Sequence, residues 1–388
     1  MPLPETEDGY QEIRAAVRAL CAEFPDEYHR KIAAAHSYPE AFVEALTKAG
    51  WLAAMIPQDF GGSGLGLAEA SVIMEEVNRS GGNAGACHGQ MYNMGTLLRH
   101  GSAEQKARYL PAIARGELRL QSMAVTEPSA GTDTTKIKTT AVRKGDRYIV
   151  SGQKVWISRI QHSDLMILLA RTAPADQVTK RSDGLSIFIV DVHQALAKGM
   201  DIRPIANMVG HETNEVFFDE LEIPAENLIG EEGKGFRYIL DSLNPERILI
   251  GSEAIGIGRD ALRRAANYAR ERVVFDRPIG MNQGIQHPLA ERWMYLESAF
   301  LMCQKAAHLY DSGKPCGAEA NAAKFLAARA SHDAAWQAIV THGGMGYAKE
   351  YHVERLYREA AVTRIVPITE QLIMSFIAEK VLDLPKSY

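Results

Sequence analysis

The sequence predicts an α+β fold with an N-terminal all-α domain, a central β-barrel-like or β-sandwich domain, and a C-terminal four-helix-bundle domain. Two observations predict this order. Apolar residues recur at helical spacing near both ends of the chain, and short apolar runs divided by Gly, Asp and Pro fill the middle. A length of 388 residues also exceeds the roughly 100–200 residues usual for one domain, so more than one unit is expected.

The helical pattern of residues 1–118 is clearest in AFVEALTKAGWLAAM and LAEASVIMEEV. Residues 119–225 contain the strand-like runs DRYIVSGQKVWIS, DLMILLA, LSIFIVD and NEVFFDELEI. Helical spacing returns in residues 226–388, with long segments at 249–273, 287–311 and 316–341. Because strands and helices do not alternate, and no GxGxxG joins a strand to a helix, a doubly wound sheet is excluded.

Composition and charge exclude several classes of function. The net charge of −5 lacks the basic surplus that a nucleic-acid partner requires. The four cysteines form no CxxC or Cys/His cluster, so neither a disulfide framework nor a metal site is indicated. The N-terminus has no basic segment followed by an apolar one, and no apolar run approaches the ~20 residues that span a bilayer. We therefore expect a cytoplasmic protein without membrane insertion.

The turn-rich segment AVTEPSAGTD, residues 124–133, opens the predicted β domain. Thr126 and Thr132 provide hydroxyl groups there that can point at a ligand rather than into a strand ladder. In QKVWIS, residues 153–158, strand alternation would place Trp156 and Ser158 on one face, where an aromatic ring and a hydroxyl could bracket a flat ligand.

Two further motifs lie in the C-terminal part. Arg272 and Phe275, in ERVVF, place a guanidinium, which can grip pyrophosphate oxygens, close to an aromatic ring. HGGMGY, residues 342–347, contains glycines, including Gly343 and Gly344, whose missing side chains permit close approach to a ligand.

This ordered set of motifs, together with RIVPITEQ at 364–371, resembles the acyl-CoA dehydrogenase family over nearly the whole chain. The resemblance implies an FAD cofactor whose pyrimidine side is hydrogen-bonded by Thr126 and whose ring contacts Trp156 and Ser158. It also implies that the ADP half of FAD in a neighbouring subunit is reached from the C-terminal domain by Arg272, Phe275, Gln283 and the loop holding Gly343 and Gly344. A homotetramer is the family expectation.

Two positions depart from the family pattern. Asp276 stands where Gly is usual, and its carboxylate would repel a pyrophosphate unless Arg277 compensates. Val340 stands where a Gln is usual, so one expected polar contact is missing.

The chemistry implied by the resemblance is removal of a proton from carbon 2 of an acyl thioester by a carboxylate, with flavin N5 taking the hydride from carbon 3. Two glutamates are candidates for the base. Glu246, in LNPER, resembles the base of isovaleryl- and long-chain-type members, and Asn244 and Pro245 predict a helix start that would stabilise it. Glu370 is near the C-terminal base position of medium- and short-chain members, but the usual EGT is absent. We favour Glu246.

The resemblance further implies an acyl-CoA substrate and an electron-transfer flavoprotein as electron acceptor. Residues 90–95 and the helix after Glu246 are expected to shape the acyl pocket. A flavin oxidase or monooxygenase on the same scaffold and a non-catalytic superfamily member are the alternatives. A carboxylate base favours dehydrogenation, and the net negative charge disfavours a DNA-associated protein.

Overall fold

The computed structural model of the chain describes residues 9–210 and 213–387, which divide into two compact units. Unit 1 contains the described residues up to Ala35, Gly66–Ala84 and those from Asn244 onward. Unit 2 contains His36–Leu65 and Gly85–Leu243. Because each unit combines segments that are distant in sequence, the division into three consecutive domains stays a prediction.

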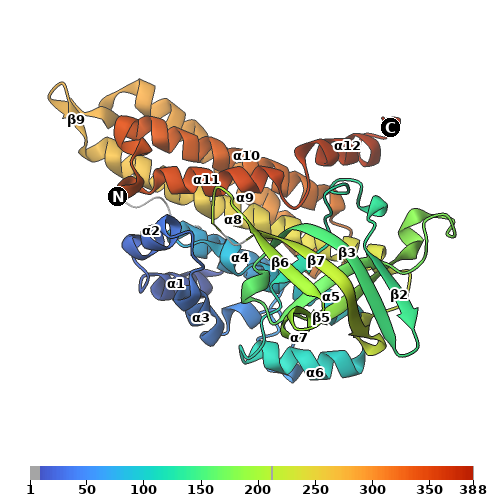
Figure 1. Cartoon of the computed structure of the whole chain (residues 1–388). Helices are drawn as coiled ribbons and strands as arrows, with labels where there is room; N and C mark the ends of the chain where they lie inside the picture. Colours follow the sequence, from blue (N-terminus) through green and yellow to red (C-terminus); the bar gives the residue numbers. More distant parts are fainter. Residues whose placement is uncertain (1–8, 211–212, 388) are drawn as a thin grey trace. The chain divides into compact units, whose positions relative to one another are not determined.

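Unit 1 is helical apart from one short hairpin (Figure 1). Its helices are α1 (Gln11–Cys21), α2 (Asp26–Ala34), α4 (Leu67–Arg79), most of α8 (Gly235–Glu271), α9 (Gln283–Asp311), α10 (Gly317–His342), α11 (Val353–Ile365) and α12 (Glu370–Lys380). The hairpin strands are β9 (Val273–Val274) and β10 (Arg277–Pro278).

The bundle of α8, α10 and α11 is held together by a core in which small residues predominate. One buried cluster contains Ile257, Ala261, Ala265, Ala335, Ala338, Val353, Leu356 and Ala360. These residues recur at intervals of three or four along each helix, which places them on one face. Alanines at the contact faces allow close helix packing, so the alanine-rich α10 can lie beside its neighbours in Figure 1.

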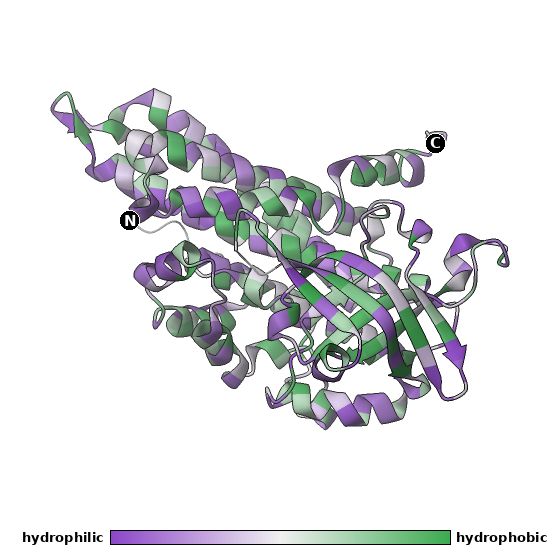
Figure 2. Ribbon diagram, viewed as in Figure 1, coloured by the Kyte–Doolittle hydropathy of each residue, from purple (hydrophilic) through white to green (hydrophobic). Residues whose placement is uncertain are grey.

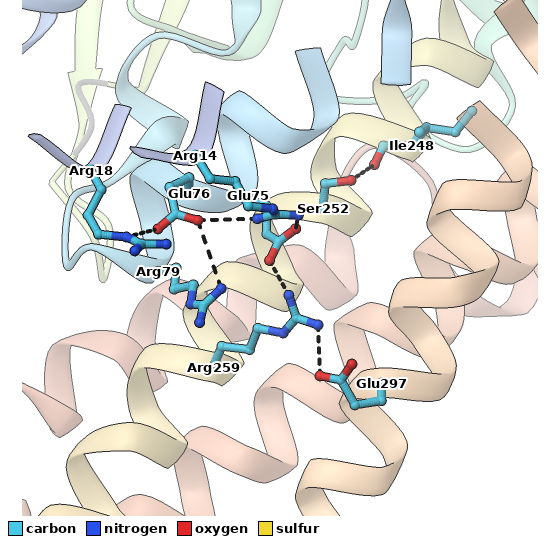
Figure 3. Close-up of polar contacts among 9 residues, drawn as sticks. All are labelled: Arg14, Arg18, Glu75, Glu76, Arg79, Ile248, Ser252, Arg259 and Glu297. Carbon is cyan, nitrogen blue, oxygen red and sulfur yellow. Dashed lines mark hydrogen bonds and ion pairs between the residues drawn. The ribbon is translucent and has the colours of Figure 1, made fainter. Parts of the chain in front are cut away.

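A buried ion-pair network links four helices of unit 1 (Figure 3). Glu75 of α4, only 2% exposed, accepts a hydrogen bond of 2.9 Å from Arg14 of α1 and a second from Arg259 of α8. Arg259 also donates to Glu297 of α9 at 2.7 Å. Burial raises the pKa of Glu75, but the two arginines more than offset this, so its carboxyl stays ionised.

Unit 2 is built on a mixed sheet flanked by helices. The strand order is β6-β7-β3-β2-β4-β5-β8, and β1 pairs in parallel with β4. The strands are β1 (Ser122–Ala124), β2 (Thr140–Lys144), β3 (Arg147–Ser158), β4 (Leu165–Arg171), β5 (Leu185–Asp191), β6 (Met200–Ile205), β7 (Thr213–Pro224) and β8 (Leu228–Ile229). The helices are α3 (Glu40–Lys48), α5 (Gly89–His100), α6 (Ala103–Ala114) and α7 (Val192–Leu196).

The central strands β4 and β5 are covered on both faces. Alternate β4 residues, such as Ile167, share a core with Leu97 of α5 and Leu110 of α6. The intervening residues, such as Leu168, share a second core with Val150 of β3 and its neighbours on β7. The apolar side chains of β4 therefore pack on both faces of the sheet, which explains why this strand is buried throughout and apolar up to Ala170. Figure 2 shows the mixed apolar and polar colouring of the more exposed strands in front.

The helical, sheet, helical order along the chain confirms the predicted α+β fold class. Within residues 9–210 and 213–387, no single helix has the length and apolar character to cross a bilayer. By length and composition alone, the bent pair of α11 and α12 could do so.

The network around Glu75 predicts a large effect of removing one buried charge. Replacing Glu75 with Ala leaves Arg14 and Arg259 buried without their shared acceptor, which should cost about 3–5 kcal/mol. The matched control is Glu44→Ala, which removes an exposed partner of Lys48 and should cost at most about 1 kcal/mol. Thermal unfolding of both variants tests this. Equal melting temperatures for the two variants would show that the network adds no stability.

Candidate active site

The segment containing Thr126 is fixed against strand β3. The backbone N–H of Val155 donates to the carbonyl oxygen of Thr126 at 2.9 Å, immediately before Trp156. Thr126 itself is half-buried, and Thr132 is exposed in the turn that follows. The structure therefore brings Thr126 next to the QKVWIS strand, while Thr132 lies farther out.

A buried ion pair between Lys154 and Glu127 anchors the same segment. The Lys154 ammonium is 0% exposed and donates to Glu127 Oε1 at 3.0 Å and to the carbonyl oxygen of Val125 at 2.9 Å. Glu127 also accepts the backbone N–H groups of Lys138 and Thr139 at 2.6 and 2.9 Å. Burial lowers the pKa of Lys154 to about 8, and Glu127 limits the decrease. Both residues flanking Thr126 are thus held by charged contacts.

Trp156 is placed by a β-bulge rather than by regular strand alternation. Between the pairs Lys154–Val216 and Ile157–Asn214, β3 carries one residue more than β7, and Trp156 has φ of +64°. Regular alternation would put Lys154 on the face of Trp156, yet Lys154 is fully buried and Trp156 is 59% exposed. Ser158, two residues later, is half-buried. The two predicted residues, Trp156 and Ser158, are therefore both accessible, but a bulge in the strand, and not regular alternation, places Trp156.

In unit 1, Arg272 and Phe275 lie at the β9–β10 hairpin. Arg272 directly follows α8, and Phe275 is 93% exposed. Phe275 and Asp276 form the two-residue turn with φ of +51° and +61°, the geometry of a type I′ hairpin. Asp tolerates this left-handed conformation, which explains why it can replace Gly. Arg277 donates to Asn282 Oδ1 at 2.6 Å and so turns toward Asn282.

The glycine loop follows α10, and its glycines have different roles. A Cβ atom on Gly343 or Gly344 would meet no heavy atom within 4 Å, whereas one on Gly346 would lie 2.4 Å from the Ile339 carbonyl oxygen. Gly346 is therefore required for packing, and Gly343 and Gly344 leave the backbone open.

Contacts of Tyr268, near the C-terminal end of α8, bring the glycine loop and Arg272 close together. The His342 ring, just before the loop, stacks on Tyr268 at 4.3 Å, and Arg272 donates its N–H to the Tyr268 carbonyl oxygen. Gln283, the first residue of α9, is also exposed.

The helix around Glu246 differs from the sequence-based expectation. Helix α8 begins at Gly235, so Glu246 lies inside the helix and not in its first turn. Pro245 has no N–H to donate to the carbonyl oxygen of Asp241, and Arg99 donates to that oxygen instead, at 2.5 Å. Asn244 does not start the helix, and its side chain accepts from Arg247 at 2.8 Å. The half-buried Glu246 therefore gains nothing from a helix N-terminus.

Glu370 is held by two arginines. Its carboxylate accepts hydrogen bonds from Arg364 at 2.8 and 3.1 Å and from Arg329 at 2.8 and 3.1 Å. Burial raises the pKa of Glu370, but these bonds and charges outweigh burial and lower it to about 2. Thr369 caps α12 by accepting the Leu372 N–H, so Glu370 occupies a first-turn position where a negative charge is favourable.

Sequence reasoning missed the charged residues that support these positions: Lys154 and Glu127 in unit 2, and Arg329 and Arg364 in unit 1. A signal existed for the first pair. A lysine inside an apolar strand and a glutamate inside the neighbouring turn motif are both costly to bury alone, which predicts that they pair.

The accessible residues fit a flavin cofactor in chemistry. Unit 2 offers an exposed aromatic ring at Trp156, with the half-buried residue Thr126 on the anchored segment and the half-buried Ser158 on β3. Unit 1 offers a cation, an exposed aromatic ring and open glycine backbone, which suit a nucleotide with a pyrophosphate. This combination is typical of a protein that binds a flavin nucleotide.

Comparison with known protein families identifies the family to which the chain belongs. The chain matches models described as the N-terminal, middle and C-terminal domains of acyl-CoA dehydrogenase over residues 7–117, 122–221 and 233–382. It is 38% identical over 383 residues to the acyl-CoA dehydrogenase fadE12 of Mycobacterium bovis, covering 97% of both chains. The chain therefore belongs to the acyl-CoA dehydrogenase family, an FAD-binding family of oxidoreductases.

Two further relatives differ in their reported roles. The caffeyl-CoA reductase-Etf complex subunit CarC of Acetobacterium woodii is 32% identical over 371 residues, with 94% of this chain and 96% of that one covered. The solved glutaryl-coenzyme A dehydrogenase in complex with glutaryl-CoA is 29% identical, with a TM-score of 0.91, and covers 100% of this chain and 98% of that one. Relatives of comparable similarity thus carry out different reactions.

The Lys154–Glu127 pair predicts a loss of cofactor affinity when it is broken. Lys154→Met leaves Glu127 buried without its cation and frees the residues flanking Thr126. We expect FAD to bind at least about tenfold more weakly, equivalent to ~1.4 kcal/mol. The control, Lys144→Met, removes an exposed lysine at the end of β2 and should leave affinity unchanged. Titrating apoprotein with FAD and following flavin fluorescence measures both; unchanged affinity in Lys154→Met would refute the anchoring role.

Proposed function

We propose that this protein oxidises an acyl-CoA thioester to a trans-2-enoyl-CoA, with Glu246 as the base that removes the proton from carbon 2. The observation that carries the choice of base is the double arginine contact of Glu370. FAD, when bound, supplies the acceptor for the hydride from carbon 3. Family membership supports dehydrogenation in general, and the choice between the two glutamates rests on their surroundings.

Glu370 is poorly suited to accept a proton. A general base works best when its pKa lies near the operating pH, and the pKa of Glu370 is lowered to about 2. Protonation would also weaken its hydrogen bonds with Arg329 and Arg364. We assign Glu370 the structural role of joining α12 to α10 and α11.

Glu246 is half-buried on α8, next to the half-buried Arg247. A thioester bound against this helix would exclude water from the carboxylate, and a desolvated carboxylate is a stronger proton acceptor. The position of Glu246 inside a long helix also supports this role, because a helix holds a base in a fixed orientation better than a loop does.

For the cofactor, we propose that Thr126 contacts the pyrimidine side of the flavin, that Trp156 and Ser158 contact its ring, and that Thr132 contributes a further polar contact. We propose that Arg272, Phe275, Gln283, Gly343 and Gly344 contact the ADP half of FAD in a second copy of the chain. The near-complete exposure of Phe275 and the open backbone of the two glycines support contacts outside the copy that carries them.

Exposed apolar side chains support assembly into a homo-oligomer, for which we propose a tetramer. Trp293, Met294, Tyr295 and Leu301 are exposed on α9, and Trp336 is exposed on α10. Apolar residues gathered on neighbouring helices are typical of protein–protein interfaces. We further propose an electron-transfer flavoprotein as electron acceptor, supported by the name of the related caffeyl-CoA reductase-Etf complex subunit.

Replacing each glutamate in turn tests the assignment. Glu246→Gln keeps the shape of the side chain but removes the base, so turnover should fall by about 10²–10⁴-fold while FAD stays bound. Glu370→Gln should keep turnover within about tenfold of wild type but lower the melting temperature, because it weakens a partly buried ion pair. Steady-state reduction of an artificial electron acceptor over a series of acyl-CoAs measures both.

Three outcomes would contradict this account. Wild-type turnover in Glu246→Gln would remove Glu246 from the chemistry, and loss of turnover only in Glu370→Gln would identify the other glutamate as the base. Stoichiometric peroxide release without reduction of the artificial acceptor would instead indicate a flavin oxidase.

A further inference from the structure

A buried arginine in unit 2 has no acidic partner within the described part of the chain. Arg159 is 6% exposed, and its guanidinium donates to the Gly85 carbonyl oxygen at 2.6 Å and to the Tyr92 hydroxyl at 3.4 Å. Its Nε atom is buried without an acceptor. Among residues 9–210 and 213–387, no carboxylate lies within ion-pair distance of Arg159.

The other buried arginines of the described chain are compensated. Arg14 and Arg259 share Glu75, and Arg355 pairs with Glu359 at 2.6 Å. Arg171 donates to four backbone carbonyl oxygens. A guanidinium removed from water needs a counter-charge or a full set of acceptors, so Arg159 is the exception that requires an explanation.

The backbone directs Arg159 away from the strand and toward α5. Its φ is +61°, a left-handed conformation that a non-glycine residue adopts at some cost, directly after Ser158. Helix α5 makes room for the guanidinium with Gly89, where a Cβ atom would lie 3.0 Å from Arg159 Nη2 and 2.3 Å from the Gln121 carbonyl oxygen.

A second unpaired donor lies in the same region. Gln121 is fully buried, and its Oε1 accepts from Tyr38 at 2.9 Å, but its Nε2 has no acceptor. The Gln121 backbone and the Arg159 guanidinium pack against the same glycine, Gly89. Two unpaired buried donors, one of them cationic, are suited to an oxygen-rich anion.

Open space adjoins this region along α5. Gly95 is buried, yet a Cβ atom placed on it would meet no heavy atom within 4 Å. Tyr92 precedes Gly95 by three residues and therefore lies on the same face of the helix. The ring of His88 lies 5.5 Å from that of Tyr92, one turn earlier. A ligand following this face would pass from Gly95 toward Tyr92 and Arg159.

We propose that Arg159 binds a carboxylate at the far end of the acyl chain, so that the substrates are short acyl-CoAs carrying a second carboxylate. This inference rests on the proposed function. Arg159 directly follows Ser158, which we propose to contact the flavin ring, so a carboxylate bound by Arg159 would belong to a ligand that adjoins the flavin. The planar guanidinium can donate two parallel hydrogen bonds to a carboxylate. The Tyr92 hydroxyl and the Gln121 amide are neutral polar groups in the same region as this guanidinium.

The test compares ligands of equal chain length with and without the carboxylate. Glutaryl-CoA and pentanoyl-CoA are assayed with wild type, Arg159→Met and Arg159→Lys. We expect wild type to prefer glutaryl-CoA in kcat/KM by about 100-fold, Arg159→Met to lose that preference, and Arg159→Lys to keep part of it, because removing one partner of a buried charge pair typically costs this much. Arg143→Met, which removes an exposed arginine on β2, should keep the wild-type preference.

Binding without turnover separates this proposal from the proposed function. The thioether S-(4-carboxybutyl)-CoA cannot be dehydrogenated, and its binding to the holoprotein is followed by the change in the flavin absorption spectrum, with S-pentyl-CoA as the comparison. Tighter binding of the carboxylated thioether to wild type but not to Arg159→Met supports the proposal, even if no acyl-CoA is oxidised. Equal affinity of wild type for both thioethers overturns it, and this comparison stands even if Arg159→Met fails to fold.

Discussion

A charge removed from water must meet an opposite charge or a complete set of hydrogen-bond acceptors, and this constraint organises both units. In unit 1 it joins α1, α4, α8 and α9 through Glu75 and its arginines. In unit 2 it ties the segment around Thr126 to β3 through Lys154 and Glu127. Apolar burial supplies most of the stabilisation of such cores, but these pairs fix which segments lie together.

The same constraint separates residues of similar appearance into different roles. Glu246 and Glu370 are both glutamates near family base positions, and Glu370 is held by two arginines that keep it ionised. Arg159 and Arg171 are both buried arginines near the ends of strands, but only Arg171 is satisfied by carbonyl oxygens. Arg171 therefore serves the fold, whereas Arg159, whose Nε has no acceptor among the described residues, is available to a ligand.

The fold class could be predicted from the sequence because it depends on local periodicity. The site could be predicted in part: the motifs identified accessible residues such as Trp156 and Phe275, although their contacts with FAD stay predictions. The bulge at Trp156 was not predictable, because it depends on pairing with β7, some 60 residues away.

The helix start expected at Asn244 was wrong for a similar reason. Pro245 suits a first helical turn, but it is tolerated inside α8 because Arg99 occupies the carbonyl oxygen that Pro245 leaves without a donor. The partner lies 142 residues from Asp241 along the chain, so no local pattern reveals it. The pairing of Glu75 with Arg259 is equally remote in sequence, at 184 residues.

The most direct measurement of the central claim is an anaerobic titration of the wild-type holoprotein with a saturated acyl-CoA, following the visible absorbance of the flavin. The account predicts bleaching that is complete near one equivalent of a suitable acyl-CoA per flavin, with the trans-2-enoyl-CoA recovered as product. A flavin that stays oxidised across straight-chain, branched and carboxylated acyl-CoAs, although these ligands bind, would contradict it.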